Sequence, residues 1–322
     1  MSAPDDLTAR AADVRVLAPA SLSNLGPGFD TLGLALAGLN DTVEAWRTDT
    51  PGVRVVASAE GAAWTLPPDE KNTAAIGAQA VLEQGGADFG LVLRVTKAVS
   101  PGSGLGSSAA SAVGGAYAAA LALGLPDDAD TKTGLVEAVL QGEAAASGAR
   151  HGDNVLPSLF GGLVLVSSTD PTHYRRLPLG APLHLAVLLP QVQVLTRAAR
   201  AMLPDVVPLR DAVSNATQLA FLLGALQRGD VDEAGCCIMQ DRLVEPVRAT
   251  LVPCYEPVRR AALGADALGV ALSGSGPAMF ALCRSADHAA RVAEAMRAAS
   301  EAQGIAAFAT AAAACEQGAR QG

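Results

Sequence analysis

Pro101-Gly-Ser-Gly-Leu-Gly-Ser-Ser-Ala-Ala-Ser111 lies between a strand-like segment and a long alanine-rich segment that is predicted to be helical. Three glycines within five positions let the backbone adopt positive φ and point successive N–H groups into one concavity. Ser107 and Ser108 stand where the helix is expected to begin, and a helix N-terminus adds unpaired N–H groups and the positive end of a dipole. We interpret the stretch as a phosphate-binding loop. A glycine-rich turn that only caps a packed helix is the alternative that these residues leave open.

The two familiar phosphate motifs do not fit this loop. A Walker A loop has a lysine directly after its last glycine, whereas this chain has Ser107 there, and its nearest lysine, Lys97, precedes the loop. A dinucleotide-binding fingerprint needs a third glycine at position 107 and, after the helix, a strand with an acidic residue. Here residues 124–128 lead into a second helical segment instead. The loop therefore indicates a rarer class of phosphate site.

Length and composition limit the class of protein. The chain has 322 residues, half of them hydrophobic, and this length suggests two domains. A net charge of −9 and only 3% aromatic residues argue against nucleic acid as a partner, because phosphate backbones attract basic surfaces and bases stack on aromatic rings. The uncharged segment 98–126 is long enough to span a bilayer, but alanine, glycine and serine dominate it. We expect it to be buried within the protein.

Cysteine and histidine usage favours a reducing environment. The five cysteines include no CxxC pair, and the four histidines lack the spacing of metal ligands. Residues 1–12 have neither the basic start nor the apolar run of a secretory signal. We expect reduced thiols and a cytoplasmic location.

The order of predicted elements indicates an α+β protein with two domains, residues 10–168 and 169–315. The predicted strands are residues 14–18, 42–46, 53–57, 91–96, 163–167, 183–189 and 306–311, with two more within 269–282. The predicted helices are residues 73–83, 108–123, 131–146, 196–203, 209–228, 231–250 and 286–303. A polar segment at residues 151–157 precedes the strand at 163.

Several polar residues stand in unusual surroundings, and each also has an ordinary explanation. Asn24 and Asp30 flank a Gly-Pro-Gly turn, where Asx turns alone would account for both. Glu143 lies among glycine and alanine on a predicted helix, where it is either solvated or in need of a cation. Arg200 and Arg248 also lie on predicted helices, and arginines on helices are normally solvated. From these residues alone, both explanations remain open.

Three glycine-rich loops occur in one chain: SLSNLGPGFD (21–30), PGSGLGSSAAS (101–111) and LSGSGPAMF (272–280). In this order and at this wide spacing they resemble the loops of the GHMP small-molecule kinases. The resemblance runs from about Val14 to the C-terminal strand. Within that superfamily, residues 20–36, 148–162 and 241–255 are similar to signatures of the homoserine kinases.

The resemblance implies a fold and an activity. The fold would have an N-terminal domain like ribosomal protein S5 domain 2 and a ferredoxin-like C-terminal domain, with the nucleotide between them. The activity would be ATP-dependent phosphorylation of L-homoserine to O-phospho-L-homoserine in threonine biosynthesis, with Mg²⁺ as cofactor. The residues taken by themselves indicate only phosphate binding.

The resemblance also implies roles for individual residues. It places the triphosphate on backbone N–H groups of one loop, which is formed by Pro101, Gly102, Ser103, Gly104, Leu105, Gly106, Ser107 and Ser108. Ser108 and Glu143 would ligate Mg²⁺, which leaves positions in its octahedral shell for phosphate oxygens and water. Asn72 and Lys97 match positions near the adenine. The homoserine pocket is matched by Asn24, Asp30, His151, Asp153, Asn154, Thr196, Arg200 and Arg248.

This pocket has the charges that a zwitterion needs, acids for its ammonium and arginines for its carboxylate. Asn154 is expected to orient the reacting hydroxyl while Asp153 helps to hold the ammonium, although sequence alone does not fix which of the two faces the hydroxyl. Another GHMP kinase, for mevalonate or a sugar, stays open as an alternative, but the acids would have no role with mevalonate. A non-catalytic metabolite-binding homologue also stays open, and Ser108 and Glu143 argue against it. The oligomeric state, a homodimer included, is not determined.

Overall fold

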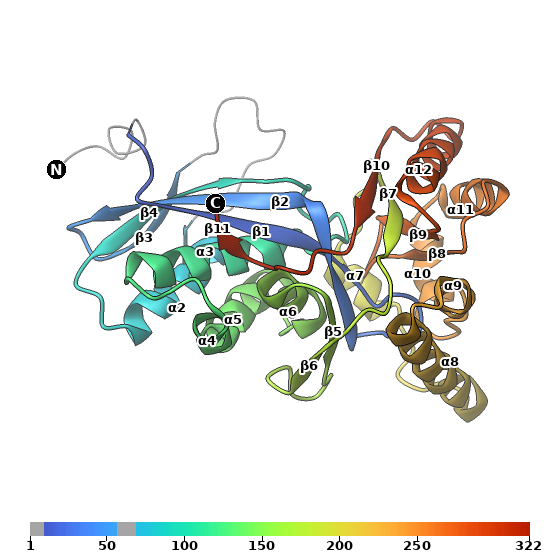
Figure 1. The fold of residues 1–322 in the computed structure, drawn as a ribbon, viewed down its shortest axis with the longest axis horizontal. Coiled ribbons are helices and arrows are strands. Elements are labelled where there is room, and N and C mark those ends of the chain that lie inside the picture. Colours follow the sequence, from blue (N-terminus) through green and yellow to red (C-terminus); the bar gives the residue numbers. More distant parts are fainter. Residues whose placement is uncertain (1–9, 57–68) are drawn as a thin grey trace.

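The computed structural model describes residues 10–56 and 69–322. These residues form an elongated molecule with one β-sheet in each half and helices packed on each sheet (Figure 1). The predicted α+β class is confirmed. The last residue of the strand predicted at 53–57 lies outside the described residues.

The N-terminal half is organised by two long antiparallel strands, β1 (Val14–Ser23) and β2 (Leu32–Thr48). On the other side of β2 lies β4 (Gly90–Thr96), and β3 (Gly52–Val56) pairs with β4 in parallel at the sheet edge. Three short strands complete the sheet as the described residues show it: β5 (Leu163–Val166), β6 (Tyr174–Leu177) and β11 (Arg320–Gln321).

Helices cover one face of this sheet (Figure 1): α2 (Thr73–Gln84), α3 (Ser107–Ala122), α4 (Ala129–Gly134), α5 (Val136–Ser147) and α6 (Gly152–Phe160). The central helix, α3, is buried along nearly its whole length. Small residues permit this burial, because a Cβ on Gly77 of α2 would lie only 2.7 Å from the carbonyl oxygen of Ala112. The expectation that segment 98–126 is buried in the protein is therefore met over α3.

The C-terminal half holds a four-stranded antiparallel sheet within residues 184–313, all of which are described. Its strands are β7 (His184–Pro190), β8 (Gly269–Leu272), β9 (Met279–Cys283) and β10 (Ala307–Ala313), in the order β10-β7-β9-β8. Helices follow β7, and α12 (Ala286–Glu301) joins β9 to β10. This β-α-β-β-α-β connection is the ferredoxin-like arrangement that was expected.

Between β7 and β8 the chain forms α7 (Thr196–Ala201), α8 (Leu209–Arg228), α9 (Val231–Ile238), α10 (Glu245–Arg248), a 3₁₀ turn η2 (Ala249–Leu251) and α11 (Tyr255–Gly264). The single helix predicted at 231–250 is therefore wrong. The Asp241 carboxylate accepts backbone N–H groups from residues 243, 244 and 245, so the chain turns there and restarts as α10.

Other predicted elements also differ from the structure. The helix predicted at 131–146 is two helices, α4 and α5, and the polar segment at 151–157 is the start of α6. Neither α11 nor the short strands β6 and β11 were predicted. The apolar residues up to 36 and the strand predicted at 42–46 form one continuous strand, β2.

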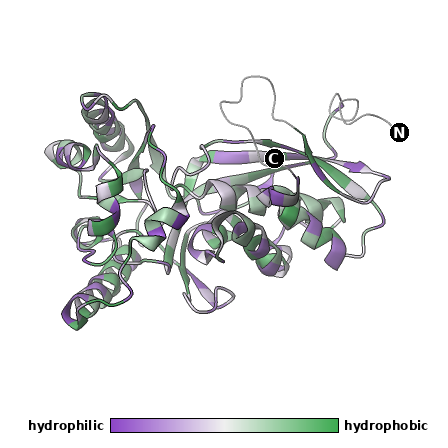
Figure 2. Cartoon of the chain, turned by 180° about the vertical axis from the view of Figure 1, so that it is seen from behind, coloured by the Kyte–Doolittle hydropathy of each residue, from purple (hydrophilic) through white to green (hydrophobic). Residues whose placement is uncertain are grey.

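The division at residue 168 stays a prediction, although two segments beyond it belong to the N-terminal sheet. β6 pairs with β5, and β11 near the C-terminus pairs with β1. The helices of both halves carry hydrophilic as well as hydrophobic residues (Figure 2), and within the described parts of the chain none is long and apolar enough to cross a bilayer.

Candidate active site

The three glycine-rich loops meet where the two halves of the molecule touch. Ala278 donates its backbone N–H to the carbonyl of Ser103 at 3.0 Å, and the Ser273 hydroxyl donates to the carbonyl of Gly104 at 2.6 Å. Gly104 has φ +80°, and a Cβ there would lie 2.6 Å from the carbonyl oxygen of Ser273. Only glycine fits such a position without strain or displacement. The loop conformation therefore depends on contact with the other half.

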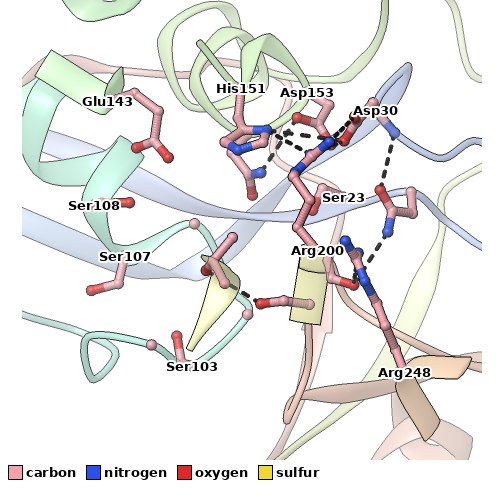
Figure 3. A pocket seen from close by; sticks show the side chains of 18 residues that line it. Ser23, Asp30, Ser103, Ser107, Ser108, Glu143, His151, Asp153, Arg200 and Arg248 are labelled. Carbon is pink, nitrogen blue, oxygen red and sulfur yellow. Dashed lines mark hydrogen bonds and ion pairs between the residues drawn. The ribbon is translucent and has the colours of Figure 1, made fainter. Parts of the chain in front are cut away.

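The phosphate-loop interpretation agrees with the local geometry. Gly106 precedes α3 with φ 64°, and within the described residues no side chain caps the helix N-terminus. The Ser107 hydroxyl donates to the carbonyl of Val99 at 3.0 Å and so is already used, whereas Ser108 points its hydroxyl toward the pocket (Figure 3). Leu105 buries its side chain in the core. An anion at this loop would therefore meet backbone N–H groups and the Ser108 hydroxyl.

Glu143 of α5 lies on the same side of the pocket as Ser108 (Figure 3). Its side chain is only 3% exposed, so the solvated-face explanation is wrong. Both residues line the inner pocket and the neighbouring larger cavity. A hydroxyl and a carboxylate are oxygen donors of the kind that Mg²⁺ prefers, so the residues fit that ion.

Asp30 and Arg200 form an ion pair across the opposite side of the pocket (Figure 3). Arg200 Nη2 is 2.7 Å from Asp30 Oδ1, and Nη1 is 2.9 Å from Oδ2. The hydrogen bond to Asp30 raises the pKa of Arg200 above its ordinary value. Asp30 lies in the loop between β1 and β2, and Arg200 lies on α7, so the pair joins the two halves.

His151 lies beside this ion pair, with Nδ1 3.4 Å from Arg200 Nη2 and 3.9 Å from Asp30 Oδ1. Burial, followed by the charge of Arg200, lowers the pKa of His151, and this favours the neutral form of the ring. Its buried Nε2 has no hydrogen-bond partner among the described residues.

Arg248 of α10 reaches the same pocket and is 3% exposed, so it is not a solvated surface residue. It donates to the carbonyl of Gly274 at 2.9 Å, and the Asn24 amide donates to the same oxygen at 3.2 Å. The Asn24 Oδ1 accepts the backbone N–H of Asp30 at 3.3 Å, so part of the Asx-turn explanation is also correct. Burial lowers the pKa of Arg248 from its ordinary value.

Asp153 and Asn154 lie in the first turn of α6 and line the inner pocket, and Asp153 is at the top of Figure 3. Burial, and next the charge of Asp30, raises the pKa of the Asp153 carboxyl to about 7. Asn154 Nδ2 donates to Asp153 Oδ1 at 3.5 Å, and the Ser21 hydroxyl lies 3.4 Å from Asn154 Oδ1. Both side chains therefore line the pocket.

Three cavities meet at these residues. The inner pocket holds about 80 Å³ and is lined by the phosphate loop together with the Asp30, Asp153, Arg200 and Arg248 group. A cavity of about 570 Å³ continues from the loop past Asn72 and Lys97, and Thr196 lines both spaces. An outer cavity of about 420 Å³ shares Asp30, His151, Asp153 and Arg200 with the inner pocket.

Asn72 and Lys97 border the larger cavity but are also used within the fold. Asn72 caps α2 by accepting the backbone N–H of Ala74 at 3.0 Å. The Lys97 ammonium contacts the Asp41 carboxylate and the carbonyl of Ser107, and donates to the Ser111 hydroxyl at 2.8 Å. Their predicted place near adenine stays a prediction.

Comparisons with known proteins assign the chain to a family. Residues 72–162 match the GHMP kinases N terminal domain, and residues 222–302 match the GHMP kinases C terminal family. The homoserine kinase of Pyrococcus abyssi is 42% identical over 83% of this chain and 87% of its own length. The chain belongs to the homoserine kinase family. The enzyme of Pyrococcus furiosus, of the same family, is 40% identical over 91% of this chain and 94% of its own.

Solved structures agree with this homoserine kinase assignment. The crystal structure of homoserine kinase from Cytophaga hutchinsonii has a TM-score of 0.89 and 37% identity, covering 96% of each chain. Mevalonate kinase of L. major, in complex with R-mevalonate, has a TM-score of 0.68 and 18% identity, covering 91% of this chain and 94% of its own. At that identity the second likeness shows the fold alone.

Sequence reasoning missed some residues of this homoserine kinase site. Ser23, Gly274 and Ser275 line the inner pocket, and the Thr196 hydroxyl lies 3.4 Å from that of Ser275. The signal was present, because the quoted loops 21–30 and 272–280 contain all three missed residues. These residues come together in one pocket only when the two halves pack against each other.

Proposed function

We propose that this protein transfers the γ-phosphoryl group of ATP to the side-chain hydroxyl of L-homoserine, giving O-phospho-L-homoserine and ADP in threonine biosynthesis. The single observation that carries this proposal is the inner pocket. There, the glycine-rich loop 101–108 faces three carboxylates, those of Asp30, Glu143 and Asp153, and two arginines within about 80 Å³. A small zwitterion with a hydroxyl is the substrate class that matches these groups.

The amino acid is proposed to bind by separating an existing ion pair. Its ammonium takes the place of Arg200 beside Asp30 and also faces Asp153, while its carboxylate takes the place of Asp30 beside Arg200 and also faces Arg248. Each buried charge then keeps a partner, which limits the cost of opening the pair. Asn24, His151 and Thr196 complete the pocket wall.

ATP is proposed to place its phosphates on residues 101–108 and its adenosine in the cavity of about 570 Å³ that Asn72 and Lys97 border. In this placement Lys97 stabilises the loop through its contact with the Ser107 carbonyl. Ser108 and Glu143 would hold Mg²⁺, and that ion supplies charge stabilisation to the phosphate oxygens when it is bound. The chain's own part is to fix these two oxygen donors beside the loop.

Asn154 is proposed to orient the homoserine hydroxyl toward the phosphate loop. Phosphoryl transfer has a loose transition state, so positioning and charge stabilisation contribute more than a general base. The hydroxyl proton then leaves late, to a phosphate oxygen. Asp153, whose pKa lies near 7, is the competing proton acceptor, because a base acts best when its pKa is near the working pH.

A coupled assay of ADP release tests the function with L-homoserine, mevalonate, galactose and shikimate. We expect turnover with L-homoserine and formation of its phosphate ester, seen by ³¹P NMR. Turnover with mevalonate or galactose instead would indicate another GHMP kinase, and no turnover with any alcohol would indicate a non-catalytic homologue. We further propose a cytoplasmic enzyme, since all five cysteines are free thiols.

A further inference from the structure

Phe29 lies against both arginines of the pocket, and none of the roles assigned so far uses it. Its ring centroid is 4.9 Å from Arg248 Cζ and 5.3 Å from Arg200 Cζ. A guanidinium within about 6 Å of an aromatic ring face is attracted by the negative electrostatic potential of that face. One ring therefore lies against two guanidinium groups, which come from different helices.

The two arginines need such support because they repel each other. The charge of Arg200 contributes to the lowered pKa of Arg248. Asp30 neutralises Arg200 directly, whereas Arg248 donates a hydrogen bond to a neutral carbonyl, that of Gly274. The buried Nε of Arg248 has no hydrogen-bond partner among the described residues. The ring face supplies attraction where hydrogen bonds are few.

Hydrogen bonds and close packing order the backbone on either side of Phe29. Thr31 donates its N–H to the carbonyl of Gly28 at 3.0 Å, and Gly28 donates to the carbonyl of Asn24 at 3.1 Å. A Cβ on Gly28 would lie 2.6 Å from the Cβ of Leu32, so the turn is closely packed. The N-terminal half thus presents an aromatic ring on a closely packed turn to arginines of the C-terminal half.

We propose that Phe29 is a positioning residue for recognition of the substrate carboxylate. Its ring keeps the guanidinium groups of Arg200 and Arg248 on one surface, so that a single carboxylate can contact both. The proposal rests on the proposed function and deepens it. It predicts that the ring acts through its electrostatics, beyond the apolar volume that it fills.

Steady-state kinetics of Phe29 variants test this proposal. We expect Phe29→Leu to raise KM for homoserine about 10-fold while kcat and KM for ATP stay within about 2-fold, since the cations lose the ring face but keep an apolar neighbour. Phe29→Tyr, which keeps the face, should restore most of the affinity. Phe308→Leu is the matched control, because Phe308 is exposed on β10 and should leave all constants unchanged.

Fluorinated phenylalanines at position 29 separate electrostatics from packing. Adding one, two and then three ring fluorines withdraws charge from the face, so KM for homoserine should rise step by step. A flat series, or an unchanged KM in Phe29→Leu, would overturn the proposal while wild-type turnover with homoserine still supports the function.

A crystal structure of Phe29→Leu gives a test that does not depend on activity. We expect the Arg248 guanidinium to leave the carbonyl of Gly274. Both arginines in their present places would overturn the proposal, even if the wild-type protein did not phosphorylate homoserine.

Discussion

Asp30 and Arg200 form a two-point ion pair, with 2.7 Å between Oδ1 and Nη2, although 170 positions separate them in the sequence. The pair forms part of the wall shared by the inner pocket and the outer cavity. Both partners are proposed to bind the substrate, so the pair marks where a zwitterion enters. The first prediction follows from the different burial of the two arginines.

Replacing either arginine with alanine should weaken homoserine binding, with the larger effect at Arg248. Truncating one partner of a desolvated charge contact costs about 2 kcal/mol or more, which corresponds to a roughly 30-fold or larger rise in KM. Arg248→Ala should reach this value. Arg200 has a side chain that is 39% exposed, so we expect a smaller rise for Arg200→Ala. KM for ATP should change little in either variant.

Arg210→Ala is the control for both changes, since Arg210 has a side chain that is 86% exposed on α8. Its homoserine KM should equal that of the wild type. If Arg200→Ala and Arg248→Ala both keep the wild-type KM, the carboxylate binds elsewhere.

Glu143→Gln should lower kcat about 100-fold or more without unfolding the protein, because the phosphoryl group loses charge stabilisation. The control is Glu137→Gln on the same helix, since Glu137 is 55% exposed and pairs with Arg150 on the surface. The measurements are turnover, its dependence on Mg²⁺ concentration and the thermal midpoint. Near-normal turnover and Mg²⁺ dependence in Glu143→Gln would remove Glu143 from the proposed metal site.

The pKa of Asp153, about 7 in the folded protein, predicts how homoserine use depends on pH. The carboxylate that faces the substrate ammonium forms as pH rises through this value. We therefore expect kcat/KM for homoserine to rise between about pH 6 and 8 and this rise to be absent in Asp153→Asn. With no protein base, kcat itself should keep its pH profile. An acidic limb in kcat that disappears in Asp153→Asn, together with most of the rate, would make Asp153 the base.

The same group predicts a pH dependence of stability. The ordinary pKa of this carboxyl is 3.8, and its pKa in the folded protein is about 7. Between these two pH values the folded protein keeps a proton on Asp153 that the unfolded chain has released. Asp153 therefore lowers the free energy of unfolding as pH rises through that window, by at most about 1.4 kcal/mol per pH unit. Urea unfolding should show that the free energy of unfolding depends less steeply on pH in Asp153→Asn than in the wild type. Equal slopes in both proteins would contradict the raised pKa.

Asn154→Ala should lower kcat about 10- to 100-fold with a smaller change in KM for homoserine, since the hydroxyl would lose its orientation. Single-turnover measurements should show that the chemical step is affected. A variant with normal kcat would show that Asn154 does not orient the reacting group.

Gly104→Ala should harm both stability and ATP binding, because the new methyl group would lie 2.6 Å from the Ser273 carbonyl oxygen and 2.8 Å from that of Gly276. The control is Gly124→Ala, which has a similar φ of +84° but open space around it. The control should be destabilised only because its alanine adopts a left-handed conformation, which costs about 1–2 kcal/mol. Urea unfolding and KM for ATP separate the two, and equal losses would argue against the loop contact.

The sequence by itself determined the features that depend on local chain geometry and apolar pattern. The loop 101–111 indicated a phosphate site, because its glycines permit positive φ and close backbone approach. The three glycine-rich loops together indicated the family through their resemblance to the GHMP kinases. Helix α8 has the predicted bounds, 209–228, since an uninterrupted polar and apolar pattern specifies it. The resemblance also identified most of the residues that line the inner pocket, although Ser23, Gly274 and Ser275 were missed and the charge partners could not be predicted.

Only the tertiary structure decided those partners. Arg200 pairs with Asp30, Lys97 contacts Asp41, and Phe29 lies against two arginines, each across a long separation in sequence. Asp241 breaks the helix predicted at 231–250 because its carboxylate accepts three backbone N–H groups. These bonds compete with the hydrogen bonds of a continuous helix, and a pattern of apolar residues does not predict them. Charge contacts and burial depend on how the halves pack, and that packing is a property of the whole chain.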